Sequence, residues 1–128
     1  MNRFTITRWP ADAGQVTINK VRARLEQEGL RPYRFEMVPG DEYGDHTHPE
    51  AEIRWVVSGR MRIRVREGAR PGARGTTCSE DARGHSGGCE YEEEIILAPG
   101  DRIDLAADVV HSADVVGDEV VVTLCASR

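Results

Sequence analysis

Positive charge is scarce in this sequence. Of its 128 residues, 17 are Lys or Arg and 22 are Asp or Glu, which gives a formal net charge of −5 at pH 7. The arginines are scattered along the chain and form no block. Because nucleic acids and anionic membranes are bound by basic surface, we expect neither as a partner.

Long hydrophobic runs are also missing. No apolar stretch approaches the roughly 20 residues that a transmembrane helix needs. The N-terminus, MNRFTITRWPADAG, lacks the apolar core of a secretory signal. These absences favour a cytoplasmic location. The chain has only three cysteines, which leave one unpaired at best, and in the cytoplasm we expect them to stay reduced.

One domain accounts for the whole chain. The length fits a single domain, and we find no internal repeat and no linker. The pattern FTITRW predicts a first strand at residues 4–9, and apolar residues at helical spacing predict an amphipathic helix at about residues 17–28, with Gly29 after its end. We expect residues 1–32, which hold both, to pack on the rest of the domain.

Alternating strands fill most of the chain after residue 32. We expect strands at residues 33–38, 52–58, 61–67, 95–97, 102–105, 109–115 and 119–125. In the third of these, Met61, Ile63 and Val65 share one face while Arg62, Arg64 and Arg66 share the other. This is typical of an antiparallel sheet with one solvated face. We expect the arginines to face solvent near the acidic run at 92–94.

The stretch GDEYGDHTHPEAEIRWVVSG, residues 40–59, has the strongest chemical signal. It places His46, His48 and Glu52 at i, i+2 and i+6. In an extended chain, residues an even number apart point to the same face. Two neutral imidazoles and a carboxylate that converge on one point can bind a divalent transition metal.

The same stretch resembles the first motif of the cupin superfamily. The spacing Gly40-x5-His46-x-His48-x3-Glu52-x6-Gly59 matches that motif at every spaced position. Downstream, PGDRIDLAADVVHSAD resembles the second cupin motif, with Gly100 and His111 where that motif has Gly and His. The segment departs from the usual pattern in three places. Ala106 stands where the motif has Pro, and Asp108 stands where it has Gly. No Asn follows His111 at the usual distance.

The resemblance implies both a fold and a site. The fold is all-β, a small antiparallel β-barrel or jelly roll, here with one N-terminal helix. The site is one divalent transition metal (Fe, Ni, Mn or Zn) held by His46, His48, Glu52 and His111. Small cupins often pair or swap N-terminal strands, so the resemblance also implies a homodimer.

Residues 68–90 form a long Gly-rich insertion without a hydrophobic period, which predicts a flexible loop. Cys78, His85 and Cys89 lie within it. They are compatible with a second zinc site, with a Cys78–Cys89 disulfide that would stabilise by roughly 2–3 kcal/mol, or with an ordinary reduced loop. The spacing matches no established zinc pattern, and a fourth ligand is missing.

Arg54 is the second candidate functional residue. It shares the face of Glu52 two positions away, so an inward guanidinium can hold an anionic substrate by paired hydrogen bonds. The alternative is a salt bridge or an escape to the barrel mouth. The order His46, His48, Glu52, Ile53, Arg54, Trp55 also resembles acireductone dioxygenase, a cupin that uses iron or nickel on an enediol. We therefore take Arg54 and Glu52 as candidate catalytic residues.

Two classes of function fit these residues. The first is a metal-dependent enzyme, most readily an oxygenase on a small enolisable or anionic compound, with an isomerase or lyase as a variant. Open metal positions in a dry pocket, lined by apolar residues such as Met61, Ile63, Val65, Val56 and Val109, would serve that chemistry. The second is a non-catalytic cupin that binds a metal or a small ligand. The same ligands serve both.

Overall fold

A computed structural model describes residues 3–66 and 92–128 of the chain. The predicted loop at 68–90, with Cys78, His85 and Cys89, lies outside the described residues. The elements in chain order are β1 (Phe4–Thr7), a short 3-10 turn η1 (Ala11–Ala13), α1 (Ile18–Gln27), β2 (Tyr33–Met37), β3 (Glu42–His46), β4 (Glu52–Ser58), β5 (Met61–Arg66), β6 (Glu92–Leu97), β7 (Arg102–Leu105), β8 (His111–Val115) and β9 (Val121–Ser127).

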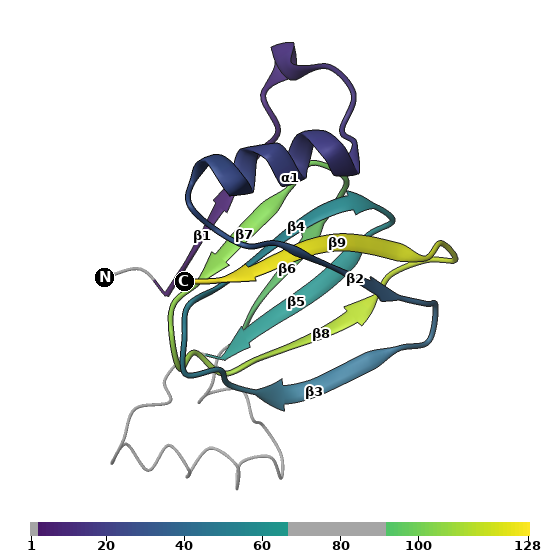
Figure 1. Cartoon of the computed structure of the whole chain (residues 1–128). Helices are drawn as coiled ribbons and strands as arrows, with labels where there is room; N and C mark the ends of the chain where they lie inside the picture. The colour runs from purple at the N-terminus through teal and green to yellow at the C-terminus, as the bar shows by residue number, and fades with distance from the viewer. Residues whose placement is uncertain (1–2, 67–91) are drawn as a thin grey trace, which may run out of the picture.

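The strands form two antiparallel sheets (Figure 1). The five-stranded sheet has the order β1-β7-β4-β9-β2, and the four-stranded sheet has the order β3-β8-β5-β6. Nearly every neighbouring pair is distant in sequence, because the chain crosses between the sheets after β2, β3, β4, β6, β7 and β8. This is the small all-β jelly roll that the sequence predicts.

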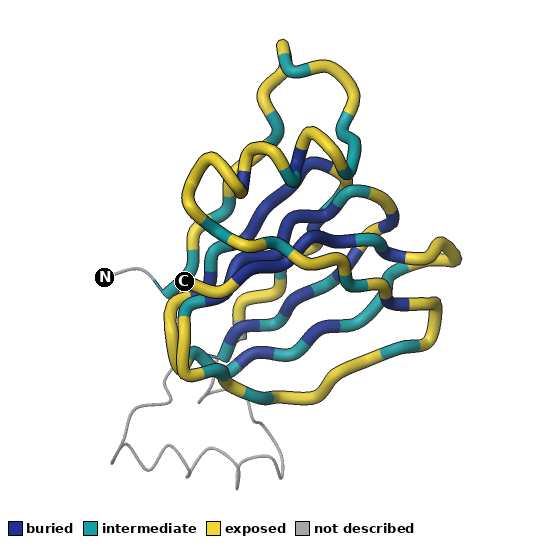
Figure 2. The backbone as a smooth tube through the Cα atoms, in the orientation of Figure 1, coloured by how far each residue is buried: buried dark blue, intermediate teal, exposed yellow. Residues whose placement is uncertain are grey.

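The main core fills the space between the two sheets. Alternation in β5 sends Met61, Ile63 and Val65 inward, with at most 2% of each exposed, and leaves its arginines on the outer face. The buried side chains that meet them are Met37, Val56, Leu97, Ile103, Leu105, Ala113 and Val121. Figure 2 shows this burial along the central strands, with exposed backbone at the edges.

A second core lies under α1, on the outer face of the five-stranded sheet (Figure 1). Val21 and Leu25 of the helix are fully buried against Ile53, Trp55 and Leu124. The helix therefore covers the face of β4 opposite Glu52 and Arg54. The Thr17 side chain caps the helix by accepting a hydrogen bond from the Lys20 backbone N–H at 3.2 Å.

The helix ends as predicted. After Glu28, Gly29 takes the left-handed conformation with φ +84°, which only a glycine adopts at little cost. Among the described residues, no helix is both long enough and apolar enough to cross a membrane.

Several strand boundaries differ from the predictions. β2 ends at Met37 rather than Val38, β6 begins at Glu92 rather than Ile95, β8 at His111 rather than Val109, and β9 at Val121 rather than Glu119. Two further boundaries are set by partner strands. The first strand ends at Thr7 rather than Trp9, because Thr7 pairs with Arg102, the first residue of β7, and the chain before Arg102 is in a turn. The last strand runs to Ser127 rather than Cys125, because Ser127 pairs with Glu52 at the start of β4. Local hydrophobic pattern does not specify either boundary, since each is set by the length of a partner strand.

The outer face of β5 is a row of ion pairs. Arg62 contacts Asp114 with Nη2–Oδ2 at 2.7 Å, and Arg64 contacts Glu94 with Nε–Oε1 at 3.1 Å. Arg66 contacts Asp45 with Nε–Oδ2 at 2.9 Å. The predicted pairing of this strand with the acidic run is confirmed by the register of β5 and β6. These arginines are engaged on the surface and do not line the site.

Candidate metal centre

His46 reaches the site through an irregularity in β3. Tyr43 pairs with Ala113 and His46 pairs with His111, so three residues of β3 span two residues of β8. A bulge of this kind adds one residue and re-aims the side chain that follows it. The imidazole is then fixed by its Nδ1, which donates to the carbonyl oxygen of Gly44 at 2.7 Å. The other ring nitrogen, Nε2, is therefore available to bind a ligand at the site.

His111 approaches from the first position of β8. Only 2% of the residue is exposed, and its Nδ1 donates to the carbonyl oxygen of Val109 at 2.9 Å. Burial lowers the pKa of His111, which the Val109 hydrogen bond partly opposes. The side chain is therefore held neutral at pH 7, with the lone pair of Nε2 free for a ligand.

His48 and Glu52 reach the same point by a different route from the one predicted. The prediction treated His46, His48 and Glu52 as one extended segment, but β3 ends at His46 and β4 begins at Glu52. His48 lies in the connection between them, where its carbonyl oxygen accepts a hydrogen bond from the backbone N–H of Asp108 at 2.8 Å. The chain turns between the ligands, so the connection and its contact with Asp108 bring them together.

Four side chains converge at this point. The rings of His46, His48 and His111 have centroids 4.4–5.3 Å apart, and one nitrogen of each lies within 4.8 Å of the others. Glu52 Oε1 lies 3.1 Å from His48 Nε2 and 3.7 Å from His111 Nε2.

Those atoms do not hydrogen-bond one another. His48 Nε2, His111 Nε2 and Glu52 Oε1 are all buried without a hydrogen-bond partner. Unpaired buried polar atoms are costly unless something satisfies them. Three imidazole nitrogens and one carboxylate oxygen around one point suit a divalent transition metal, so the residues fit the group that the resemblance implies.

Arg54 holds the carboxylate of this group. The residue is 7% exposed, and its Nε donates to Glu52 Oε2 at 3.0 Å. One carboxylate oxygen is thus engaged by the guanidinium while the other faces the histidines. Arg54 Nη1 is buried without a partner. The two interpretations of Arg54 left open by the sequence, a salt bridge and an inward-facing cation, both describe its position.

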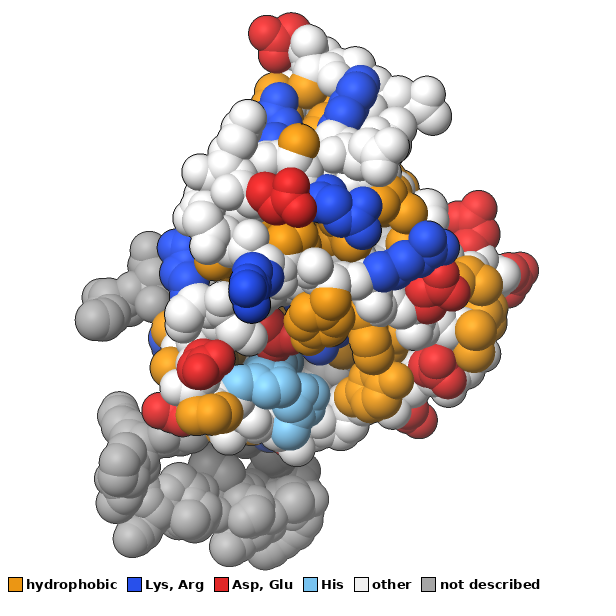
Figure 3. Space-filling view, viewed as in Figure 1, with side chains coloured by type: hydrophobic (Ala, Val, Ile, Leu, Met, Phe, Trp, Pro, Cys, Tyr) orange, Lys and Arg blue, Asp and Glu red, His pale blue; other side chains and the backbone are white. Residues whose placement is uncertain are grey.

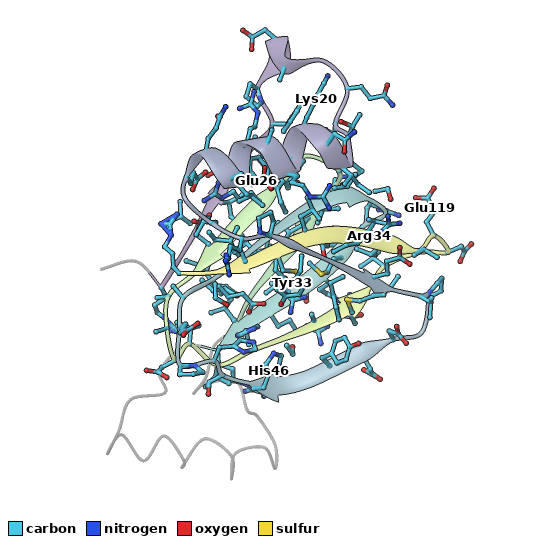
Figure 4. All side chains as sticks on the ribbon, viewed as in Figure 1. Lys20, Glu26, Tyr33, Arg34, His46 and Glu119 are labelled. Atoms are coloured by element: carbon cyan, nitrogen blue, oxygen red, sulfur yellow. The ribbon has the colours of Figure 1, made fainter. Side chains whose placement is uncertain are left out.

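A pocket of about 420 Å³ adjoins the centre. Its lining residues are Phe35, Glu42, Tyr43, Gly44, His46 and Arg54. It lies between the inner side of β2 and the edge strand β3, where the two sheets are open to solvent. Figure 3 shows imidazoles at the surface on this face, and Figure 4 shows Tyr33 and His46 on the two strands that border it.

Sequence reasoning missed part of this pocket. The apolar residues expected to line it, such as Met61 and Ile63, are packed into the core between the sheets, and Phe35 and Tyr43 form its wall instead. The alternation of Tyr33, Phe35 and Met37 places all three on one face of β2, which is a signal that could have found Phe35. Tyr43 has no such signal, because the bulge after it breaks the alternation.

A row of polar side chains crosses the inner face beside the pocket. Tyr33 pairs with Cys125, which in turn pairs with Arg54 on β4. Burial raises the pKa of the Cys125 thiol and, together with the neighbouring Cys125 and Glu52, that of Tyr33. Both groups are therefore neutral at pH 7. Cys125 is a free cysteine with 1% of the residue exposed.

No protein-family model matches the sequence, and no curated protein matches it. Several solved structures are similar. A structure concerned with the Mn(II) centres of Bacillus subtilis oxalate decarboxylase matches 77% of this chain with 20% identity and a TM-score of 0.55. The cupin domain of Drosophila melanogaster CENP-C matches 76% with 15% identity and a TM-score of 0.55. A structure of the DMSP lyases RdDddP and RnDddQII matches 77% with 24% identity and a TM-score of 0.54.

These similarities establish the cupin fold. The present chain covers 21%, 59% and 38% of those three chains respectively, so it corresponds to one part of each larger protein. The three belong to different classes of protein: one is a decarboxylase, one is a structure of lyases, and one is a domain of CENP-C. The fold is therefore common to all of them, and function has to be argued from the residues of the site.

Proposed function

We propose that this chain is a metal-dependent enzyme that holds one divalent transition metal through His46, His48, Glu52 and His111. Its substrate is a small enolisable or anionic organic compound, and its chemistry is of the oxygenase type. The observation that carries the proposal is the convergence of His48 Nε2, His111 Nε2 and Glu52 Oε1, all buried and unpaired, beside an open pocket.

The types of ligand atom at the site narrow the range of metal ions that it suits. Imidazole ligands suit iron, nickel and zinc, whereas carboxylate, carbonyl and water ligands suit Mg²⁺, Ca²⁺ and manganese. The three imidazoles thus favour Fe, Ni or Zn over Mg²⁺ or Ca²⁺, and the one carboxylate keeps Mn among the candidates. The Mn(II) centres of the similar oxalate decarboxylase support the same range.

Each residue has a role in this proposal. When bound, the metal supplies a Lewis acid with coordination positions open to substrate oxygens. The bonds from His46 Nδ1 to Gly44 and from His111 Nδ1 to Val109 orient the two rings and leave each Nε2 for the metal. Arg54 holds Glu52 Oε2, so the carboxylate presents its other oxygen to the centre.

Oxygen consumption tests the reaction type. Protein loaded separately with iron, nickel or manganese would be mixed with enediols and small keto acids in an oxygen-electrode cell. We expect substrate-dependent uptake with at least one metal, and its loss in Glu52→Gln. Arg62→Gln, on the outer face of β5, is the matched control and should keep the activity.

The outcomes separate the alternatives. If none of the loaded forms consumes oxygen, the oxygenase type is wrong. Substrate conversion without oxygen, followed by NMR, would then identify an isomerase or lyase. Metal binding with no conversion of any compound would instead identify the non-catalytic binding protein.

A further inference from the structure

The charge balance of the site points to the kind of ligand it takes. Cys125 and Tyr33 lie beside Arg54 on β9 and β2, and a thiol and a phenol are ordinarily neutral at pH 7. Glu52 and Arg54 are the oppositely charged pair. A divalent metal added to that pair leaves two excess positive charges among the buried groups, where charges interact more strongly than in water. One positive charge remains even when the exposed Glu42 of the pocket lining is counted. Such a site favours an anion.

Arg54 provides a specific contact for that anion. Its side chain is 9% exposed, and Nη1 has no hydrogen-bond partner although Nε is bound to Glu52. The guanidinium carbon lies 5.5 Å from the centre of the Phe35 ring. The guanidinium is thus hydrogen-bonded to Glu52 and packed near Phe35 in the pocket lining, and Nη1 keeps an unused donor.

The rest of the pocket is aromatic. The Phe35 and Tyr43 rings lie 5.9 Å apart at an angle of 46°, so they form one continuous wall. Flat apolar groups pack well against such rings. Among the described lining residues, Arg54 is the one cation and Glu42 is acidic. A second carboxylate on the ligand would therefore find no further cation in this lining and would add to the negative charge of Glu42.

We propose that the substrate is a small monocarboxylate with a flat apolar body. Its carboxylate contacts the Arg54 guanidinium, and its body lies along the wall formed by Phe35 and Tyr43. The claim that this ligand is the substrate rests on the proposed function, but its binding can be measured without turnover. The volume of about 420 Å³ is more than large enough to admit a molecule of this size.

The probes are benzoate and benzamide, which share size and shape and differ in charge. Calorimetric titration of metal-loaded protein, with metal content measured on the same sample, should give benzoate an affinity at least 10-fold above that of benzamide. Terephthalate, which adds a second carboxylate, should bind at least 10-fold more weakly than benzoate. Equal affinities for benzoate and benzamide would overturn the proposal.

Variants assign the contact. Arg54→Gln should remove the preference for benzoate, while Arg34→Gln should keep it, because Arg34 pairs with Glu36 on the exposed side of β2. If Arg54→Gln fails to fold, Tyr43→Ala replaces it, since Tyr43 is 40% exposed and can be truncated at the surface. Tyr43→Ala should weaken benzoate about 5-fold or more and leave acetate unchanged. Unchanged benzoate binding in that variant would overturn the proposal.

Repeating the titration on protein stripped of metal distinguishes failure of the proposed function from failure of the proposed carboxylate contact. Arg54-dependent binding of benzoate to a protein that takes up no metal would contradict the proposed function and support the carboxylate contact. One metal per chain with no discrimination between benzoate and benzamide would contradict the carboxylate contact and leave the proposed function standing.

Discussion

Asp108 occupies a backbone conformation that usually belongs to glycine. It is the one non-glycine residue with a positive φ (62°) in the part of the chain that the structure describes, and the resembled motif has Gly at this position. Asp tolerates this region better than most residues but still at a cost. Its backbone N–H donates a hydrogen bond to the carbonyl oxygen of His48 at 2.8 Å. This turn therefore also positions His48, a proposed metal ligand.

Substitution at Asp108 measures that cost. Asp108→Gly should leave the free energy of unfolding unchanged or raise it by up to about 1 kcal/mol, since relief of strain is partly offset by the entropy of glycine in the unfolded chain. Asp108→Val should lower it by about 1–2 kcal/mol, because a β-branched residue fits this conformation poorly. Urea titrations of both variants make the measurement. A valine variant as stable as the wild type would show that the turn is not strained.

His111 tests the proposed ligand set. We expect His111→Ala to weaken metal binding at least about 100-fold, because a ligand is lost from a buried site. His85→Ala, in the predicted loop that lies outside the described residues, is the control and should bind metal normally. Equilibrium dialysis against a metal indicator measures both. If His85→Ala loses the metal and His111→Ala keeps it, the metal belongs to the loop.

The sequence predicted the proposed ligands better than it predicted their surroundings. His46, His48, Glu52 and His111 were named from spacing and resemblance, and the structure brings all four together. Phe35 and Tyr43 were not named, because the register between strands and the bulge after Tyr43 depend on pairing partners far away in the chain.

At the scale of elements, a buried arginine ties the helix to the sheet. Arg102 of β7, 8% exposed, donates to both oxygens of Glu28 at 2.6 and 3.0 Å, just after the end of α1. Its guanidinium also lies 5.0 Å from the centre of the Trp55 ring. The amphipathic pattern predicts that a helix exists and which face is apolar. This ion pair fixes where its C-terminal end lies.

The pair makes stability depend on pH. The hydrogen bond from Arg102, followed by Arg128, lowers the pKa of Glu28 from 4.5 to about 2. Because the folded pKa is below the unfolded one, the stabilisation is fully present above pH 4.5 and is lost as the pH falls towards 2. The Glu28 side chain is 34% exposed, so solvent screening limits the effect to about 1 kcal/mol.

Glu28→Gln isolates this contribution. The difference in free energy of unfolding between wild type and Glu28→Gln should be greatest at neutral pH and should shrink between pH 4.5 and 2. Thermal or urea unfolding across that interval measures it, with Glu26→Gln on the exposed side of the helix as the control. A difference that stays constant with pH would show that the ion pair does not contribute as described.

At the scale of the whole molecule, the fold class followed from the sequence and the strand order did not. Alternation predicted the strands and helical spacing predicted the one helix, while the cupin resemblance implied the all-β fold, and both the helix and the fold class are confirmed. The order β1-β7-β4-β9-β2 joins strands that are far apart in the chain. Local periodicity contains no information on such pairings.

The homodimer stays a prediction from the cupin resemblance. β1 and β2 are the edge strands of the five-stranded sheet, and edge strands offer unpaired backbone groups to a second chain. Light scattering coupled to size-exclusion chromatography should give about twice the mass of one chain. A monomer mass at all concentrations would contradict it.

Metal content tests the central claim most directly. The protein would be purified without a metal-affinity tag and measured by elemental analysis, before and after incubation with iron, nickel, manganese and zinc in turn. We predict one transition metal per chain, with iron, nickel or manganese bound as purified. A protein that contains no metal and takes up none of the four would contradict the proposed centre at His46, His48, Glu52 and His111.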